Sequence, residues 1–173
     1  MKVTKTDIEG VVILTPRIFI DERGYFFESW SRHEFEEKIG KIDFCQDNES
    51  MSTYGVIRGL HFQNPPYAQS KLVQCIKGRV LDVAVDIRKG SPTYGKHVAV
   101  ELTEDNHRQL FIPKGFQYKC DNFYHPEADG GISLEDETLG IDWKIPDELK
   151  ILSEKDKRHI KLNEFDSPFR YDK

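Results

Sequence analysis

The fold is decided by the stretch Lys77–Ile87, whose sequence is KGRVLDVAVDI. After the turn at Lys77-Gly78, every second residue is a large apolar one. Successive side chains of a β-strand point to opposite faces, so this alternation predicts a strand with one strongly apolar face. The apolar set is Leu81, Val83, Val85 and Ile87, and the opposite face holds Asp82, Ala84 and Asp86.

Strand-like segments continue on both sides of this stretch. The pattern from Lys71 to Leu102 is β throughout, and the apolar run Leu110–Ile112 ends at Pro113. Nearer the start, Val11–Glu28 is rich in β-branched and aromatic residues and predicts two strands around the turn Asp21–Gly24. Many short strands with Gly and Pro turns predict an all-β chain, folded as a double-stranded β-helix or jelly-roll barrel.

Helical signals are few. Ser31 can cap a helix that continues to Ile39, and Gly40 can end it. The polar segment 147–156 predicts a short helix with a turn. Only a few short helices are therefore expected beside the strands.

Composition limits the domain organisation and the partners. A length of 173 residues fits a single domain over 1–173. The net charge of −5 favours neither nucleic acid nor an anionic membrane as a partner. No stretch approaches the ~20 apolar residues of a membrane span, and the start lacks a signal-like segment, so we expect a cytoplasmic protein. The cysteines Cys45, Cys75 and Cys120 are widely spaced and predict neither a disulfide framework nor a zinc site.

The segment from Gln46 to Gln63 crowds amide, Arg and His side chains into strand-like sequence. If Arg58, Leu60 and Phe62 face one side of a strand, His61 faces the other side and can point into a cavity. The residues alone leave two interpretations of His61 open, a structural histidine with satisfied partners or a catalytic base.

Several motifs, in one order from Met1 to Asp156, resemble the dTDP-4-dehydrorhamnose 3,5-epimerases, a family of RmlC-like cupins. In this chain they read DERGYFFE at 21–28, QDN at 46–48, RGLHFQ at 58–63, PPYAQSK at 65–71, YKC at 118–120, LGIDW at 139–143 and LSEKD at 152–156. The resemblance implies a jelly-roll fold and a homodimer.

The resemblance also implies chemistry beside a ketone. The family inverts C3 and C5 of dTDP-4-keto-6-deoxyglucose, and both carbons flank the C4 carbonyl, so each inversion needs a base, an oxyanion stabiliser and an acid. His61 matches the family base, Asp156 its orienting carboxylate, Lys71 the cation near the oxyanion, and Tyr118 the acid on the opposite face. No cofactor is implied. A metal site is disfavoured because His61 lacks the neighbouring His that a cupin metal site requires, and Gln117 and Tyr118 stand where the last ligand is expected.

Further residues match the substrate contacts of the family, and they are Arg23, Glu28, Gln46, Asn48, Arg58, Tyr124, Asp129 and Lys155. Asp129 stands where the family usually has Glu. Without the resemblance, other interpretations of these residues stay open: Asp21–Glu28 as a charged hairpin, Arg58 as a strand-edge cation and Tyr124 as core packing.

The chain departs from the family between Phe116 and Tyr118. The family carries about thirteen more residues there, roughly one strand and its turn, with a substrate-contacting His. The resemblance therefore leaves three alternatives beside the double epimerase: an epimerase acting at one carbon, a keto-sugar isomerase, and a nucleotide-sugar-binding relative without turnover.

Overall fold

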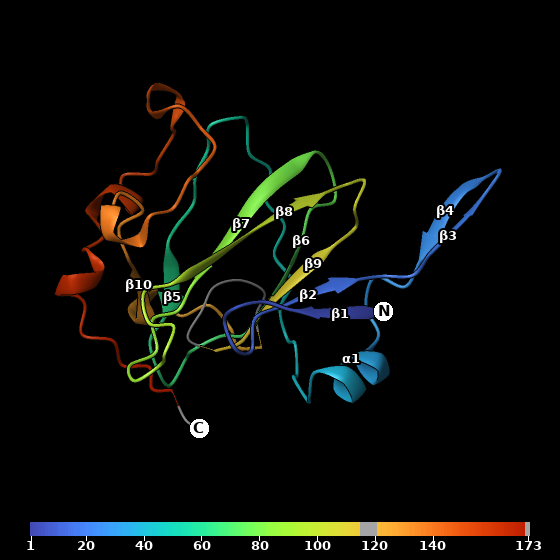
Figure 1. Cartoon of the computed structure of the whole chain (residues 1–173), viewed down its shortest axis with the longest axis horizontal. Coiled ribbons are helices and arrows are strands. Elements are labelled where there is room, and N and C mark those ends of the chain that lie inside the picture. The colour runs from blue at the N-terminus through green and yellow to red at the C-terminus, as the bar shows by residue number, and fades with distance from the viewer. Residues whose placement is uncertain (115–120, 172–173) are drawn as a thin grey trace.

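The computed structural model describes residues 1–114 and 121–171, and its largest element is an antiparallel four-stranded sheet (Figure 1). The strand order is β1-β2-β9-β6, in which the two N-terminal strands join two strands from the middle of the chain. These strands are β1 (Lys2–Lys5), β2 (Val12–Thr15), β9 (Gln109–Ile112) and β6 (Lys71–Gln74). The predicted apolar strand before Pro113 is confirmed by β9.

Three further pairs of antiparallel strands complete the β structure. They are β3 (Ile18–Asp21) with β4 (Gly24–Phe27), β5 (His61–Gln63) with β10 (Asp129–Gly131), and β7 (Arg79–Val85) with β8 (His97–Thr103). The prediction of a mostly β chain is confirmed. Within residues 1–114 and 121–171 the sheets do not close into a barrel.

The deciding stretch forms β7, and its alternation separates two parts of the core. Val83 and Val85 pack with Leu60 and Phe62 of the β5 segment. Ala84, on the opposite face, packs with a different cluster that includes Leu110. Both faces of β7 are therefore covered, and the predicted alternation is confirmed.

The predicted helix is α1 (Arg32–Lys38), and its signals act as expected. The Ser31 hydroxyl accepts a hydrogen bond from the Glu34 backbone N–H, at 3.4 Å. Phe35 is fully buried and meets the Phe111 ring edge-on, with centroids 5.2 Å apart. This contact attaches the helix to the four-stranded sheet.

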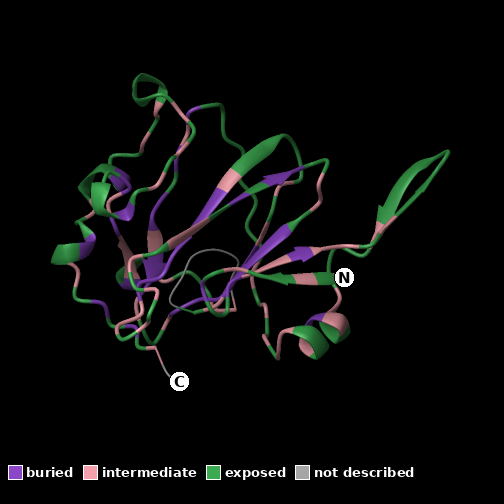
Figure 2. Ribbon diagram, viewed as in Figure 1, coloured by how far each residue is buried: buried purple, intermediate pink, exposed green. Residues whose placement is uncertain are grey.

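The β3–β4 hairpin projects away from the body of the molecule (Figure 1), and nearly all of it is exposed (Figure 2). Phe19, Ile20, Tyr25 and Phe26 are all at least half exposed on it, and Ile20 reaches 81%. Such a concentration of exposed apolar side chains is unusual on a monomer and typical of an interaction surface.

The C-terminal part of the chain is built from short 3-10 turns that cover the β5 and β7 side of the core. They are η1 (Pro126–Ala128), η2 (Glu137–Leu139), η3 (Asp147–Leu149), η4 (Asp156–Arg158) and η5 (Leu162–Glu164). Leu162 and Phe169 pack in the same cluster as Phe62 and Val83. No helix in the described part of the chain is long and apolar enough to cross a membrane.

Candidate active site

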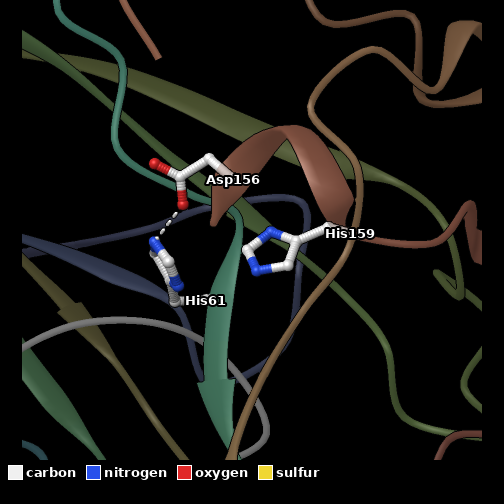
Figure 3. Close-up of side chains that lie close together, drawn as sticks. All are labelled: His61, Asp156 and His159. Atoms are coloured by element: carbon white, nitrogen blue, oxygen red, sulfur yellow. Dashed lines mark ion pairs between the residues drawn. The ribbon is translucent and has the colours of Figure 1, made fainter. Parts of the chain in front are cut away.

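The centre of the site is a histidine–carboxylate pair from two distant parts of the sequence (Figure 3). His61 Nε2 lies 2.7 Å from Asp156 Oδ1, and the two side chains are 20% and 4% exposed. The contact is an ion-pair contact without the alignment of a hydrogen bond. Oδ1 of Asp156 accepts no hydrogen bond from any described residue. The structure thus brings together the two residues that the resemblance pairs, and their catalytic roles stay predictions.

Local structure explains how each member is held. His61 opens β5, directly after Gly59, whose φ of +143° favours glycine. Because the chain turns there, Arg58 lies outside the strand and is exposed, so the expected strand over 58–63 is wrong in its first half. Asp156 opens η4, where Ser153 Oγ accepts from the Asp156 N–H at 3.1 Å and donates to Oδ2 at 2.8 Å.

The surroundings of His61 favour its neutral form. Burial lowers the pKa of His61 below its ordinary 6.5, because a charged imidazolium loses hydration there. The negative charge of Asp156 opposes this shift, whereas Lys155 adds to it. A neutral imidazole beside a carboxylate can accept a proton and be stabilised after accepting it.

A polar chain continues from the pair toward the surface. Lys155 forms an ion pair with Asp129, and Tyr124 Oη donates to Asp129 Oδ2 at 3.4 Å. The Tyr124 backbone N–H reaches Gln46 Oε1, also at 3.4 Å. Four of the predicted substrate-contacting residues are thus brought together, and Tyr124 is 54% exposed rather than packed in the core.

Lys71 and Asp82 form a second polar centre inside the fold. Lys71, the first residue of β6, is 6% exposed, and Asp82 on β7 is 8% exposed. Burial raises the pKa of Asp82 to about 7, and the positive charge of Lys71 limits the rise. Lys71 is therefore not a solvated lysine at the start of a strand, because it is buried where its positive charge acts on the Asp82 carboxyl group.

Three predicted contacts lie apart from the His61–Asp156 pair within a single chain. Arg23 is at the tip of the hairpin, 85% exposed and paired with Asp21. Glu28 lines a pocket formed by the N-terminal strands and α1. Arg58 donates to Ser52 Oγ at 3.1 Å and is exposed.

Two predicted site residues remain, and the structure describes only one of them. Asn48 is exposed and accepts from Gln46 Nε2 at 2.9 Å, so it adjoins the polar chain at Gln46. Tyr118 lies outside the described residues, as do Phe116 and Gln117, so the predicted acid and the departure beside it stay predictions.

Sequence reasoning missed His159 as a residue of the site and did not recognise that Asp82 is buried. His159 lies beside His61, with ring centroids 5.1 Å apart and nearly perpendicular planes. Its separation of three from Asp156 was a usable signal, because residues three apart share a face in a 3-10 turn. Asp82 was recognised on a shared face with Ala84, but an acidic residue on an apolar strand is also the signal that reveals a buried carboxyl group.

Known proteins resemble this chain in sequence. The family model described as dTDP-4-dehydrorhamnose 3,5-epimerase matches residues 5–164. A dTDP-4-dehydrorhamnose 3,5-epimerase of Escherichia coli (strain K12) is 50% identical over 178 residues, covering 95% of this chain and 96% of the relative.

Solved structures of similar proteins share the fold of this chain. The RmlC epimerase of Legionella pneumophila, in complex with dTDP-4-keto-L-rhamnose, is 42% identical with a TM-score of 0.93 and covers 99% of both chains. ChmJ, a 3'-monoepimerase from Streptomyces bikiniensis in complex with dTDP-quinovose, is 29% identical with a TM-score of 0.82, covering 91% of this chain and 86% of its own.

Proposed function

Because the chain belongs to the dTDP-4-dehydrorhamnose 3,5-epimerase family, we propose that it inverts C3 and C5 of dTDP-4-keto-6-deoxyglucose, with His61 as the base. The observation that carries this assignment is the contact between His61 Nε2 and a carboxylate that is 96% buried. The Asp156 charge selects the tautomer with the proton on Nε2. Nδ1 then keeps the lone pair that accepts the sugar proton.

Each inversion is a proton exchange through an enolate. His61 Nδ1 takes the proton from the carbon beside the C4 carbonyl, and the electron pair of the C–H bond moves to the carbonyl oxygen. Lys71 supplies the positive charge that stabilises this oxygen. The carbon then receives a proton on its opposite face from the Tyr118 hydroxyl, as the family motif at 118–120 implies.

The nucleotide and the sugar are held by the surrounding polar residues. Lys155, Asp129 and Tyr124 form one edge beside the catalytic pair, and Gln46 adjoins it. Gln46 and Asn48 supply amide contacts, and Arg58 supplies a guanidinium group that fits diphosphate oxygens. The substrate is thus a small nucleotide sugar, and the reaction needs no cofactor.

We infer that the protein acts as a homodimer, in which the hairpin of each chain reaches the other. The exposed apolar residues of β3 and β4 need a partner surface, and Arg23 stands at the end of this projecting arm. Arg23 and Glu28 then complete the substrate site of the neighbouring chain. This arrangement accounts for the distance of both residues from His61 within one chain.

We also infer that the fold is one jelly-roll domain over 1–173 in which a strand typical of the family is missing between Phe116 and Tyr118. The alignment with the Escherichia coli relative runs over 178 residues, more than the 173 of this chain.

The test is proton NMR of dTDP-4-keto-6-deoxyglucose with the protein in deuterated water. We expect deuterium to enter both C3 and C5, and the exchange to disappear in His61→Ala. Binding of the nucleotide sugar without exchange would overturn the proposal and favour the non-catalytic alternative.

A one-carbon epimerase is the second candidate, because the 3'-monoepimerase ChmJ shares the fold. Inversion at one carbon beside the carbonyl needs a base just as inversion at two carbons does, so the His61–Asp156 pair does not separate the two reactions. Deuterium at C3 alone would favour the one-carbon enzyme, and a product whose ketone has moved from C4 to another ring carbon would indicate a keto-sugar isomerase.

A further inference from the structure

His159 has no role in the proposed reaction, yet it is built into the site. Its ring occupies the space that a side chain at residue 131 would need: a Cβ added to Gly131 would lie 2.3 to 2.5 Å from the imidazole atoms. Gly131 pairs with His61 across β10 and β5, so the strand register brings the two histidines together. The close fit holds His159 in one place.

The nitrogen Nδ1 of His159 is buried and has no hydrogen-bond partner among the described residues. The same ring interacts with the backbone of Gly59, next to the β5 segment. A histidine ring that packing holds in place, with a buried nitrogen that lacks a hydrogen-bond partner, can act as a metal ligand. A buried polar atom without a partner otherwise costs stability.

Three potential ligand atoms converge at this point. One atom each from His61, Asp156 and His159 lies within 4.8 Å of the others, and the three side chains point toward one another (Figure 3). Asp156 Oδ1 is itself buried without a well-aligned hydrogen bond. A metal ion with bonds of about 2.1 Å holds its ligand atoms ~3.4 Å apart. His61 Nε2 and Asp156 Oδ1, now 2.7 Å apart, would have to separate slightly, and His159 would have to approach them.

We propose that His61, Asp156 and His159 form a binding site for a divalent transition metal of the Zn²⁺ type, and that the bound metal inhibits the enzyme. Two imidazoles and one carboxylate are ligands that zinc prefers, and they leave a fourth position open to water. These ligands differ from the set that the sequence excluded, because two of them come from the C-terminal segment.

Inhibition follows from the tautomer of His61. A metal on Nε2 displaces the proton from that nitrogen, so the neutral imidazole must hold its proton on Nδ1. Nδ1 then has no lone pair with which to accept the proton of the sugar. The metal also occupies the Asp156 oxygen that stabilises the protonated base. Binding of the metal and proton abstraction by His61 therefore exclude each other.

The site is tested directly with Co²⁺, whose visible absorption reports coordination, in the full chain without substrate. We expect a saturable visible band, displaced by Zn²⁺, and at least about tenfold weaker binding in His159→Ala. His159→Gln keeps a polar side chain of similar length and should lose the band as well. A thermal melt establishes that both variants fold.

His125 offers a matched control. Its Nδ1 lies 2.9 Å from Glu127 Oε1, a His–carboxylate pair that forms no three-residue cluster among the described residues. His125→Ala should bind Co²⁺ like the unaltered protein. Absence of the band in the unaltered protein, or equal Co²⁺ affinity in folded His159→Ala, would overturn the proposal.

A second measurement concerns inhibition. Zn²⁺ should slow deuterium exchange in the unaltered protein, and a chelator should restore it. The zinc concentration that halves the exchange rate should rise about tenfold or more in His159→Ala. If the protein shows no exchange at all, the Co²⁺ titration still decides on the metal site, so failure of the epimerase assignment remains distinguishable.

Discussion

The catalytic pair and the β3–β4 hairpin differ in almost every physical property. His61 and Asp156 are mostly or fully buried and held by contacts of their own chain. Arg23, at the tip of the hairpin, is 85% exposed, and within the described part of the chain its ion pair is with its neighbour Asp21. In the proposed dimer, the groups that transfer the proton are assembled within one chain, whereas Arg23 is delivered to the substrate site of the other.

The largest expected effect is that of His61→Ala. Loss of the base should lower kcat by about 10²- to 10⁴-fold, the contribution typical of a positioned general base. Deuterium exchange at C3 and C5 measures the loss. His33→Ala, on the exposed face of α1, is the control and should exchange at the normal rate. Normal exchange in His61→Ala would remove the buried pair from the mechanism.

Asp156→Asn should have the next largest effect, a loss of about tenfold to a hundredfold in kcat, because the negative charge that stabilises the protonated base is lost. The pH profile sharpens the assignment. Burial lowers the pKa of His61, so the acid limb of activity should have its midpoint below 6.5, with activity lost as the pH falls and His61 becomes protonated.

Asp156 raises the pKa of His61, so in Asp156→Asn this acid limb should move to still lower pH. A limb that stays in place would show that the carboxylate does not interact with the base.

Arg23→Ala should lower kcat/KM by about tenfold, because a guanidinium contact to diphosphate is lost. Mixing two inactive or weakened variants tests whether Arg23 serves its own chain or the neighbouring one. If Arg23 serves the neighbouring chain, a mixture of Arg23→Ala and His61→Ala chains contains dimers with one complete site, and activity rises above that of either variant.

If Arg23 served its own chain, no mixed dimer would hold a complete site, and the mixture would show no gain. Enzyme assays of re-associated chains, with each variant alone as the reference, distinguish the two outcomes.

The smallest expected effect is on stability. Ile20→Glu with Phe26→Glu places charges on the exposed hairpin, and the mass measured by light scattering should fall from dimer to monomer. Each change should alter the free energy of unfolding of the separate chain by about 0.5 kcal/mol or less, because both side chains are already in water. A much larger loss would mean that the hairpin packs on its own chain.

The sequence by itself predicted the elements whose signals are local. The alternation around Val83 and Ala84 depends only on the two-residue period of a strand, and the α1 helix depends on Ser31 and its first turn. The motifs around His61 and Asp156 predicted the catalytic pair by resemblance. Local patterns did not predict where this strand begins. Gly59 has a positive φ, and the strand starts only after it, at His61, so Arg58 lies outside the strand.

Only the tertiary structure decided which distant groups meet and how far they are buried. His159 became part of the site because β5 pairs with β10 and Gly131 leaves room for its ring. The raised pKa of Asp82 and the lowered pKa of His61 depend on burial, a property that neighbours far along the chain create. Sequence periodicity determines which face a side chain takes, whereas packing between segments determines what that face meets.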